Sequence, residues 1–169
     1  MAYRVTDAAS ARLGKLLRES GKKLAVAESC TGGLLAGAIT AVPGSSDYFL
    51  GGVVAYHNGV KTAALGVPPG LIDSRGAVSA EVASAMAEGV LDRFPADVSI
   101  ATTGVAGPGG GSRGKPVGTV WVAVALRGGV RYSHRFRFRG DRGKVRRDTV
   151  RAAIAAASGL LTGKQGSSA

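Results

Sequence analysis

The chain has 169 residues, a formal net charge of +11 and one cysteine, Cys30. This length suits a single domain that buries a core without cross-links, and one cysteine excludes an intrachain disulfide, which favours a reducing, cytoplasmic location. The amino terminus lacks a signal-peptide pattern and no apolar run could span a bilayer, so no membrane partner is expected. The positive charge favours anionic partners such as phosphorylated metabolites, nucleic acids or acidic proteins.

Hydrophobic periodicity predicts helices that alternate with strands. Helices are expected over residues 7–20, 34 to about 43, 57–65, 80–94 and 142–161, and strands over 24–28, 49–56, 97–102, 119–126 and 130–139. Residues 67–74 contain two prolines and are expected to be irregular, residues 103–118 form a loop, and Gly128-Gly129 makes a hairpin turn. This order predicts a single three-layer α/β/α domain with a mixed sheet over residues 1–162, followed by a disordered tail at 163–169.

Residues 24–35 contain the first candidate site. A short apolar strand ends at Ser29, and a helix pattern restarts at Leu34, with Thr31 as a candidate N-cap. In an open α/β sheet this is where ligands bind, and Gly32 and Gly33 would leave the first backbone N–H groups of the helix open to an anion. The alternative is an ordinary strand-to-helix turn. Ser29 and Cys30 are both possible nucleophiles, and alternation in an extended strand would turn only one of them toward the crevice.

A serine nucleophile needs a base, and Lys61 is the candidate. It follows the strand that ends near Tyr56 and falls in the first turns of the next helix, where the helix dipole and burial would both lower its pKa. If strands 24–28 and 49–56 are neighbours, then Ser29, Tyr56 and Lys61 converge at one sheet edge. The alternative is that Lys61 is a solvated helix residue and Tyr56 an ordinary aromatic side chain at the end of a strand.

The glycine-rich loop at 103–118 contains strings that match a dinucleotide fingerprint and the start of a P-loop. Both signatures require a helix directly afterwards, whereas an apolar strand follows here, so both are rejected. Thr103 and Gly104 follow a strand and are expected to border the same crevice as Ser29.

Strand 130–139 alternates basic and aromatic residues. Ten of the 22 basic residues lie between Arg127 and Arg151. Alternation places the phenylalanines and arginines of this strand on opposite faces, so bases could not stack on the phenylalanines beside the arginines, and a solvated arginine face is favoured over nucleic-acid binding. His134, on the aromatic face, is expected to be packed in the core.

Seven short strings occur in order along nearly the whole chain, at residues 27–33, 43–46, 56–61, 76–79, 103–110, 115–120 and 140–142. Together they resemble the CinA C-terminal domain family, the nicotinamide-nucleotide amidohydrolases, in its stand-alone form. The resemblance implies a three-layer α/β fold, often dimeric, and cytoplasmic hydrolysis of nicotinamide mononucleotide to nicotinic acid mononucleotide and ammonia in pyridine nucleotide salvage.

The resemblance also implies roles for individual residues. Ser29 carries over as the nucleophile, Lys61 as its general base and Tyr56 as a supporting hydroxyl. The implied substrate and oxyanion contacts are Thr31, Gly32, Gly33, Thr103 and Gly104, and Arg142 is the candidate phosphate ligand. No metal or other cofactor is expected. The alternative function is a non-catalytic nucleotide- or nucleic-acid-binding protein, because of the positive charge.

Overall fold

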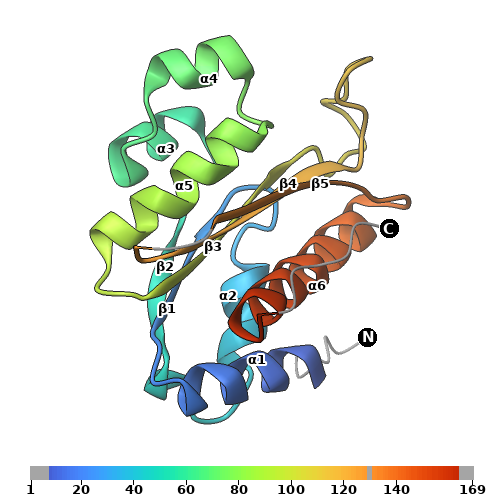
Figure 1. Cartoon of the computed structure of the whole chain (residues 1–169). Helices are drawn as coiled ribbons and strands as arrows, with labels where there is room; N and C mark the ends of the chain where they lie inside the picture. The colour runs from blue at the N-terminus through green and yellow to red at the C-terminus, as the bar shows by residue number, and fades with distance from the viewer. Residues whose placement is uncertain (1–7, 129–130, 164–169) are drawn as a thin grey trace.

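The computed structural model describes residues 8–128 and 131–163 and shows a five-stranded sheet between two layers of helices (Figure 1). The helices are α1 (Ala8–Glu19), α2 (Leu34–Thr40), α3 (Asn58–Leu65), α4 (Pro69–Arg75), α5 (Ala80–Arg93) and α6 (Arg142–Leu161), with a short 3-10 helix, η1 (Ser45–Asp47). The strands are β1 (Leu24–Glu28), β2 (Phe49–Val54), β3 (Val98–Gly104), β4 (Thr119–Leu126) and β5 (Arg131–Arg137).

The sheet is mixed, as predicted, with the strand order β2-β1-β3-β4-β5. Strand β1 pairs in parallel with β2 and β3, whereas β3, β4 and β5 pair antiparallel in turn. The carboxyl ends of β1, β2 and β3 therefore meet at one edge of the sheet. In β2, Gly52 lets β1 approach closely, because a Cβ there would lie 2.5 Å from a Val26 methyl.

Both faces of the sheet are covered, which completes the predicted three layers. Leu24 and Val26 of β1 pack with α1, α2 and α6 on one face, and Ala25 and Ala27 pack with α3, α4 and α5 on the other. All five residues of β1 are buried. The apolar run that begins at residue 24 is therefore a central strand covered on both sides, as expected of a parallel strand in an α/β protein.

Three expectations about local structure are wrong. Residues 67–74 are not irregular, because α4 spans Pro69–Arg75, with Pro69 at a first-turn position where proline is well tolerated. His134 is exposed rather than packed in the core, although its ring stacks on Tyr132 at a centroid distance of 6.0 Å and meets Phe136 edge-on at 4.7 Å. Thr31 does not cap α2, since Gly33 occupies the N-cap position with φ 95°.

Some expected features lie outside the described residues: the helix start at Asp7, the second turn glycine and the strand start at residues 129–130, and the tail from 164 onward. None of the described helices is long and apolar enough to cross a membrane.

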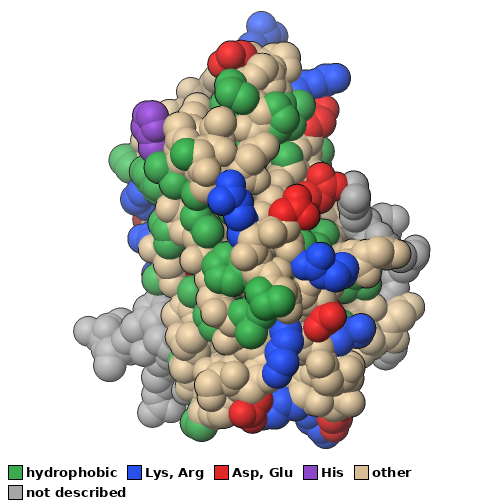
Figure 2. All heavy atoms as spheres, turned by 90° about the vertical axis from the view of Figure 1, so that its left-hand side faces the viewer, with side chains coloured by type: hydrophobic (Ala, Val, Ile, Leu, Met, Phe, Trp, Pro, Cys, Tyr) green, Lys and Arg blue, Asp and Glu red, His purple; other side chains and the backbone are tan. Residues whose placement is uncertain are grey.

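Strand β2 is an edge of the sheet and continues into an exposed apolar surface. The large hydrophobic side chains exposed on this surface are Leu50 and Val54 of β2, Tyr56 after it, and Val60 of α3. Figure 2 shows hydrophobic side chains among charged ones on the side of the molecule where β2 and α3 lie. An unpaired edge of this kind can pair with another chain, and the dimer expected from the family resemblance stays a prediction.

Candidate active site

A pocket of about 190 Å³ opens where the carboxyl ends of the parallel strands meet. Six of the residues proposed from the sequence line it: Ser29 after β1, Tyr56 after β2, Lys61 in α3, Thr103 and Gly104 at the end of β3, and Arg142 at the start of α6. The parallel pairing of β1 with β2 and β3 brings these segments together. This convergence matches the crevice predicted for residues that follow neighbouring parallel strands.

Ser29 and Cys30 both line the pocket, but their side chains differ in environment. Ser29 is 8% exposed, and its hydroxyl has no hydrogen-bond partner among the described residues. The Cys30 side chain belongs to the apolar core, and burial raises the pKa of its thiol to about 12. A thiol with such a pKa is protonated at neutral pH and is a poor nucleophile. The environment of the two side chains therefore favours Ser29.

Lys61 is 1% exposed, so the alternative of a solvated helix residue is wrong. Its Nζ donates a hydrogen bond of 3.1 Å to the backbone carbonyl of Tyr56. Removal from solvent lowers the pKa of the Lys61 amine below its usual value. Ser29 and Lys61 line the same pocket, yet the structure shows no direct hydrogen bond between their side chains. Bonds between catalytic groups often tighten only when substrate is bound.

The N–H groups at the start of α2 bind a side chain of the protein itself, and the substrate contacts expected of Thr31, Gly32 and Gly33 stay a prediction. The buried carboxylate of Glu28, the last residue of β1, accepts hydrogen bonds from the N–H groups of Gly33, Leu35 and Ala36 at 3.0, 3.1 and 2.8 Å. The protein thus supplies its own anion to the positive end of this helix.

Two further N–H groups of this turn are also engaged. Gly32 N–H donates to the Ser29 carbonyl, and Leu34 N–H donates to the Thr31 carbonyl. The Thr31 side chain is fully buried and bonds to the hydroxyl of Thr102 at 2.8 Å. Residues 31–33 are consequently not among those that line the pocket.

Two arginines of α6 hold segments around the pocket. Arg142 donates to the Gly107 carbonyl at 2.8 Å and to the Tyr56 hydroxyl at 3.0 Å. Arg146 donates to the carbonyls of Cys30 at 3.2 Å and Thr31 at 2.7 Å. Arg146 therefore fixes the turn that follows Ser29 from the far end of the sequence, a role that the sequence did not indicate.

Arginines near the basic strand support the fold in two places. Arg127 Nε donates to the Ala96 carbonyl at 2.9 Å, and its guanidinium also reaches the carbonyls of Leu91 and Phe94. Arg135 donates to the Gly114 carbonyl at 2.9 Å. Internal roles of this kind account for part of the basic cluster without a nucleic-acid partner.

The sequence missed several residues of the pocket wall. Asn58, at the start of α3, lies within the string 56–61, and Ala77 and Val78 lie within the string 76–79, yet no site role was assigned to them. Within residues 8–128 and 131–163 no group of three His, Cys, Asp or Glu side chains could hold a metal ion.

The chain is an open α/β protein whose pocket lies outside the carboxyl ends of its parallel strands. The chain belongs to the CinA C-terminal domain family, whose model matches residues 6–161. It is 58% identical over 135 residues to a CinA-like protein of a Geobacter species, which covers 80% of this chain and 32% of that protein.

Two further comparisons agree. A CinA-like protein of Desulfotalea psychrophila is 54% identical over 140 residues, 83% of this chain and 34% of that protein. The crystal structure of competence damage-inducible protein A from Klebsiella pneumoniae has a TM-score of 0.89 at 38% identity, covering 93% of this chain and 97% of that one. The chain spans about a third of the length of the curated relatives it matches.

Proposed function

We propose that this protein hydrolyses the carboxamide of nicotinamide mononucleotide to nicotinic acid mononucleotide and ammonia, with Ser29 as nucleophile and Lys61 as general base. The observation that carries the proposal is the pairing, in one pocket, of a serine hydroxyl with a buried amine of lowered pKa. A serine is a weak nucleophile without a base, and a lysine whose pKa moves toward neutrality can accept its proton.

The proposed reaction proceeds in two steps. Ser29 Oγ attacks the carboxamide carbon while the neutral amine of Lys61 takes the hydroxyl proton. The C–N bond then breaks, the Lys61 ammonium returns the proton to the leaving nitrogen, and ammonia departs from a Ser29 ester. Water attacks the ester with Lys61 again as base, the ester C–O bond breaks, and Lys61 returns the proton to Ser29. The carboxylic acid product then gives its own proton to solvent and leaves as the carboxylate.

The size of the pocket supports a binding mode in which only part of the substrate is enclosed. Its volume of about 190 Å³ is below the roughly 300–1,000 Å³ of pockets that enclose a drug-sized ligand. We assign the carboxamide end to the enclosed part and the ribose phosphate to the mouth. Tyr56, 58% exposed, and Arg142 lie there, and Arg142 retains guanidinium donors beyond the two bonds described above.

The test is ammonia release from nicotinamide mononucleotide by the wild type, Ser29→Ala and Cys30→Ala. We expect the wild type to release ammonia, Ser29→Ala to lose about 10³-fold or more of kcat, and Cys30→Ala to keep most of its activity. Loss of activity in Cys30→Ala with retention in Ser29→Ala would assign the nucleophile to the thiol. No ammonia from the wild type would reject the proposed reaction.

A further inference from the structure

The connector between α4 and α5, residues 76–79, forms one wall of the pocket through Ala77 and Val78. Two hydroxyls hold its backbone. Thr103, at the end of β3, donates to the Ala77 carbonyl at 2.8 Å, and Ser79 donates to the Gly76 carbonyl at 2.9 Å. The wall is thus attached both to the sheet and to the start of α5.

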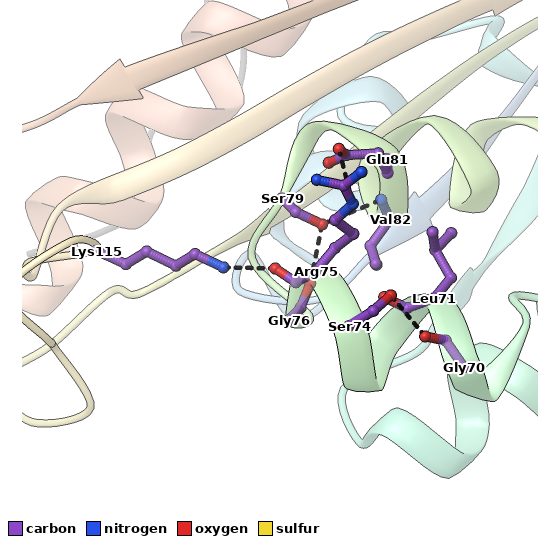
Figure 3. A network of polar contacts seen from close by, with 9 residues as sticks. All are labelled: Gly70, Leu71, Ser74, Arg75, Gly76, Ser79, Glu81, Val82 and Lys115. Atoms are coloured by element: carbon purple, nitrogen blue, oxygen red, sulfur yellow. Dashed lines mark hydrogen bonds and ion pairs between the residues drawn. The ribbon is translucent and has the colours of Figure 1, made fainter.

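Lys115 in the glycine-rich loop makes a contact directly before this connector, at the end of α4. Figure 3 shows the Lys115 side chain reaching from the loop to the end of α4, where Nζ donates to the Arg75 carbonyl at 2.7 Å. Arg75 is the last residue of α4, and carbonyls at a helix end lack partners within the helix and favour a cation. The contact therefore supplies a C-terminal cap to α4 directly before the pocket wall.

The sequence at the contact fits this role. Gly76 has φ 79°, a positive value that favours glycine, and a Cβ there would lie 2.8 Å from Lys115 Nζ. The exposed ion pair of Arg75 with Glu81, at 3.4 Å, lies at the same helix end (Figure 3). Exposed pairs of this kind contribute little to stability.

The loop presents Lys115 from a fixed backbone. Ser112 and Lys115 exchange backbone hydrogen bonds of 3.0 and 3.2 Å, and the Ser112 hydroxyl accepts from Lys115 N–H at 3.2 Å. The neighbouring Gly114 carbonyl is held by Arg135, and nearer the start of the loop the Gly107 carbonyl is held by Arg142. The loop is therefore anchored both beside Arg142 and beside the end of α4.

We propose that Lys115 is a positioning residue that sets the place of the Ala77–Val78 wall, and with it the fit of the carboxamide end of the substrate. Lys115 acts through the Arg75 carbonyl and does not touch the reacting atoms. The inference rests on the proposed amidohydrolase function, but the position of the wall is a property of the free protein and is measurable without substrate.

The experiment compares Lys115→Met, which keeps most of the apolar stem and loses the donor, with Lys115→Arg, which restores a cation. Lys22→Met, at an exposed lysine between α1 and β1, is the matched control. Kinetics of ammonia release give KM and kcat, and amide hydrogen exchange is followed in peptides that cover residues 70–84.

For Lys115→Met we expect KM to rise about three- to tenfold with kcat within about twofold, since a displaced wall weakens ground-state and transition-state binding equally. Exchange at residues 77–79 should be faster, Lys115→Arg should recover both properties in part, and Lys22→Met should match the wild type. Unchanged KM and exchange would overturn the proposal, as would faster exchange throughout the chain with a lower melting temperature.

A raised KM with unchanged exchange at residues 77–79 would also overturn it, because Lys115 would then contact the substrate directly. If the wild type releases no ammonia, the proposed function fails, and exchange at residues 77–79 alone decides whether Lys115 positions the wall.

Discussion

Replacement of Lys61 by methionine should abolish ammonia release and at the same time stabilise the fold. Lys61 is 1% exposed, and in the described structure its ammonium makes one hydrogen bond, to the Tyr56 carbonyl, although an ammonium has three donors. A buried polar group with incomplete partners costs about 1–3 kcal/mol. Methionine removes this cost, and since it is one atom shorter, the space it leaves merges with the adjoining pocket.

We therefore expect Lys61→Met to raise the free energy of unfolding by about 2 kcal/mol, an order-of-magnitude figure for relief of that desolvation. For a chain of this length the melting temperature would rise by about 4–8 °C. The control is Lys22→Met, whose exposed ammonium bears no such cost and whose melting temperature should match the wild type.

The gain in free energy of unfolding from Lys61→Met should depend on pH in a defined direction. Burial lowers the pKa of folded Lys61 below its usual 10.5, so between the two values the unfolded chain binds more protons than the folded one. Wild-type stability from this group therefore rises with pH across that window, and the advantage of Lys61→Met shrinks there. Urea unfolding at several pH values measures the difference in free energy of unfolding between Lys61→Met and the wild type. A Lys61→Met variant less stable than the wild type, or a difference that grows with pH, would refute the reasoning.

Three further predictions concern the start of α2, the packing of α5 against α3, and the pH dependence of the reaction. Glu28→Ala leaves three N–H groups at the start of α2 without their acceptor and should cost about 2–4 kcal/mol in urea unfolding, with an unchanged midpoint contradicting the assignment. Gly89→Ala places a Cβ 1.9 Å from the Leu65 carbonyl oxygen and should lower stability by about 1–3 kcal/mol, whereas a neutral effect would show that α3 and α5 separate readily. The kcat/KM for ammonia release should rise with pH through the lowered pKa of Lys61 and level off below 10.5, so a flat profile would speak against a lysine base.

The convergence of Ser29, Tyr56 and Lys61 followed from local patterns. Each of the first two parallel strands is a short apolar run, and polar residues come directly after each one. Once β1 and β2 pair in parallel, the position of both turns at one edge is set by the chain direction alone. The buried state of Lys61 was not evident, because the residues that cover it come from distant parts of the chain.

The contacts that the sequence did not indicate are made by long polar side chains over large sequence separations. Arg146 reaches the carbonyls of Cys30 and Thr31 from 116 and 115 residues away, and Lys115 reaches Arg75 from 40 residues away. Their partners are backbone carbonyls, which every residue carries, so no motif marks them. Helix α4 was missed for a different reason: it has seven residues, and its two leading prolines favour a turn as much as a helix start.

Under the proposed function, the position of Glu28 bears on where the substrate phosphate would bind. The glycines before α2 suggest an open helix N-terminus, but the Glu28 carboxylate already occupies its N–H groups and brings a negative charge that would repel a second anion. Among the residues that line the pocket, Arg142 and Lys61 carry the cationic side chains, and Lys61 must be neutral to act as a base. Under the proposed function we therefore assign phosphate recognition on this side of the pocket to Arg142, which would separate the group that binds the anion from the group that moves the proton.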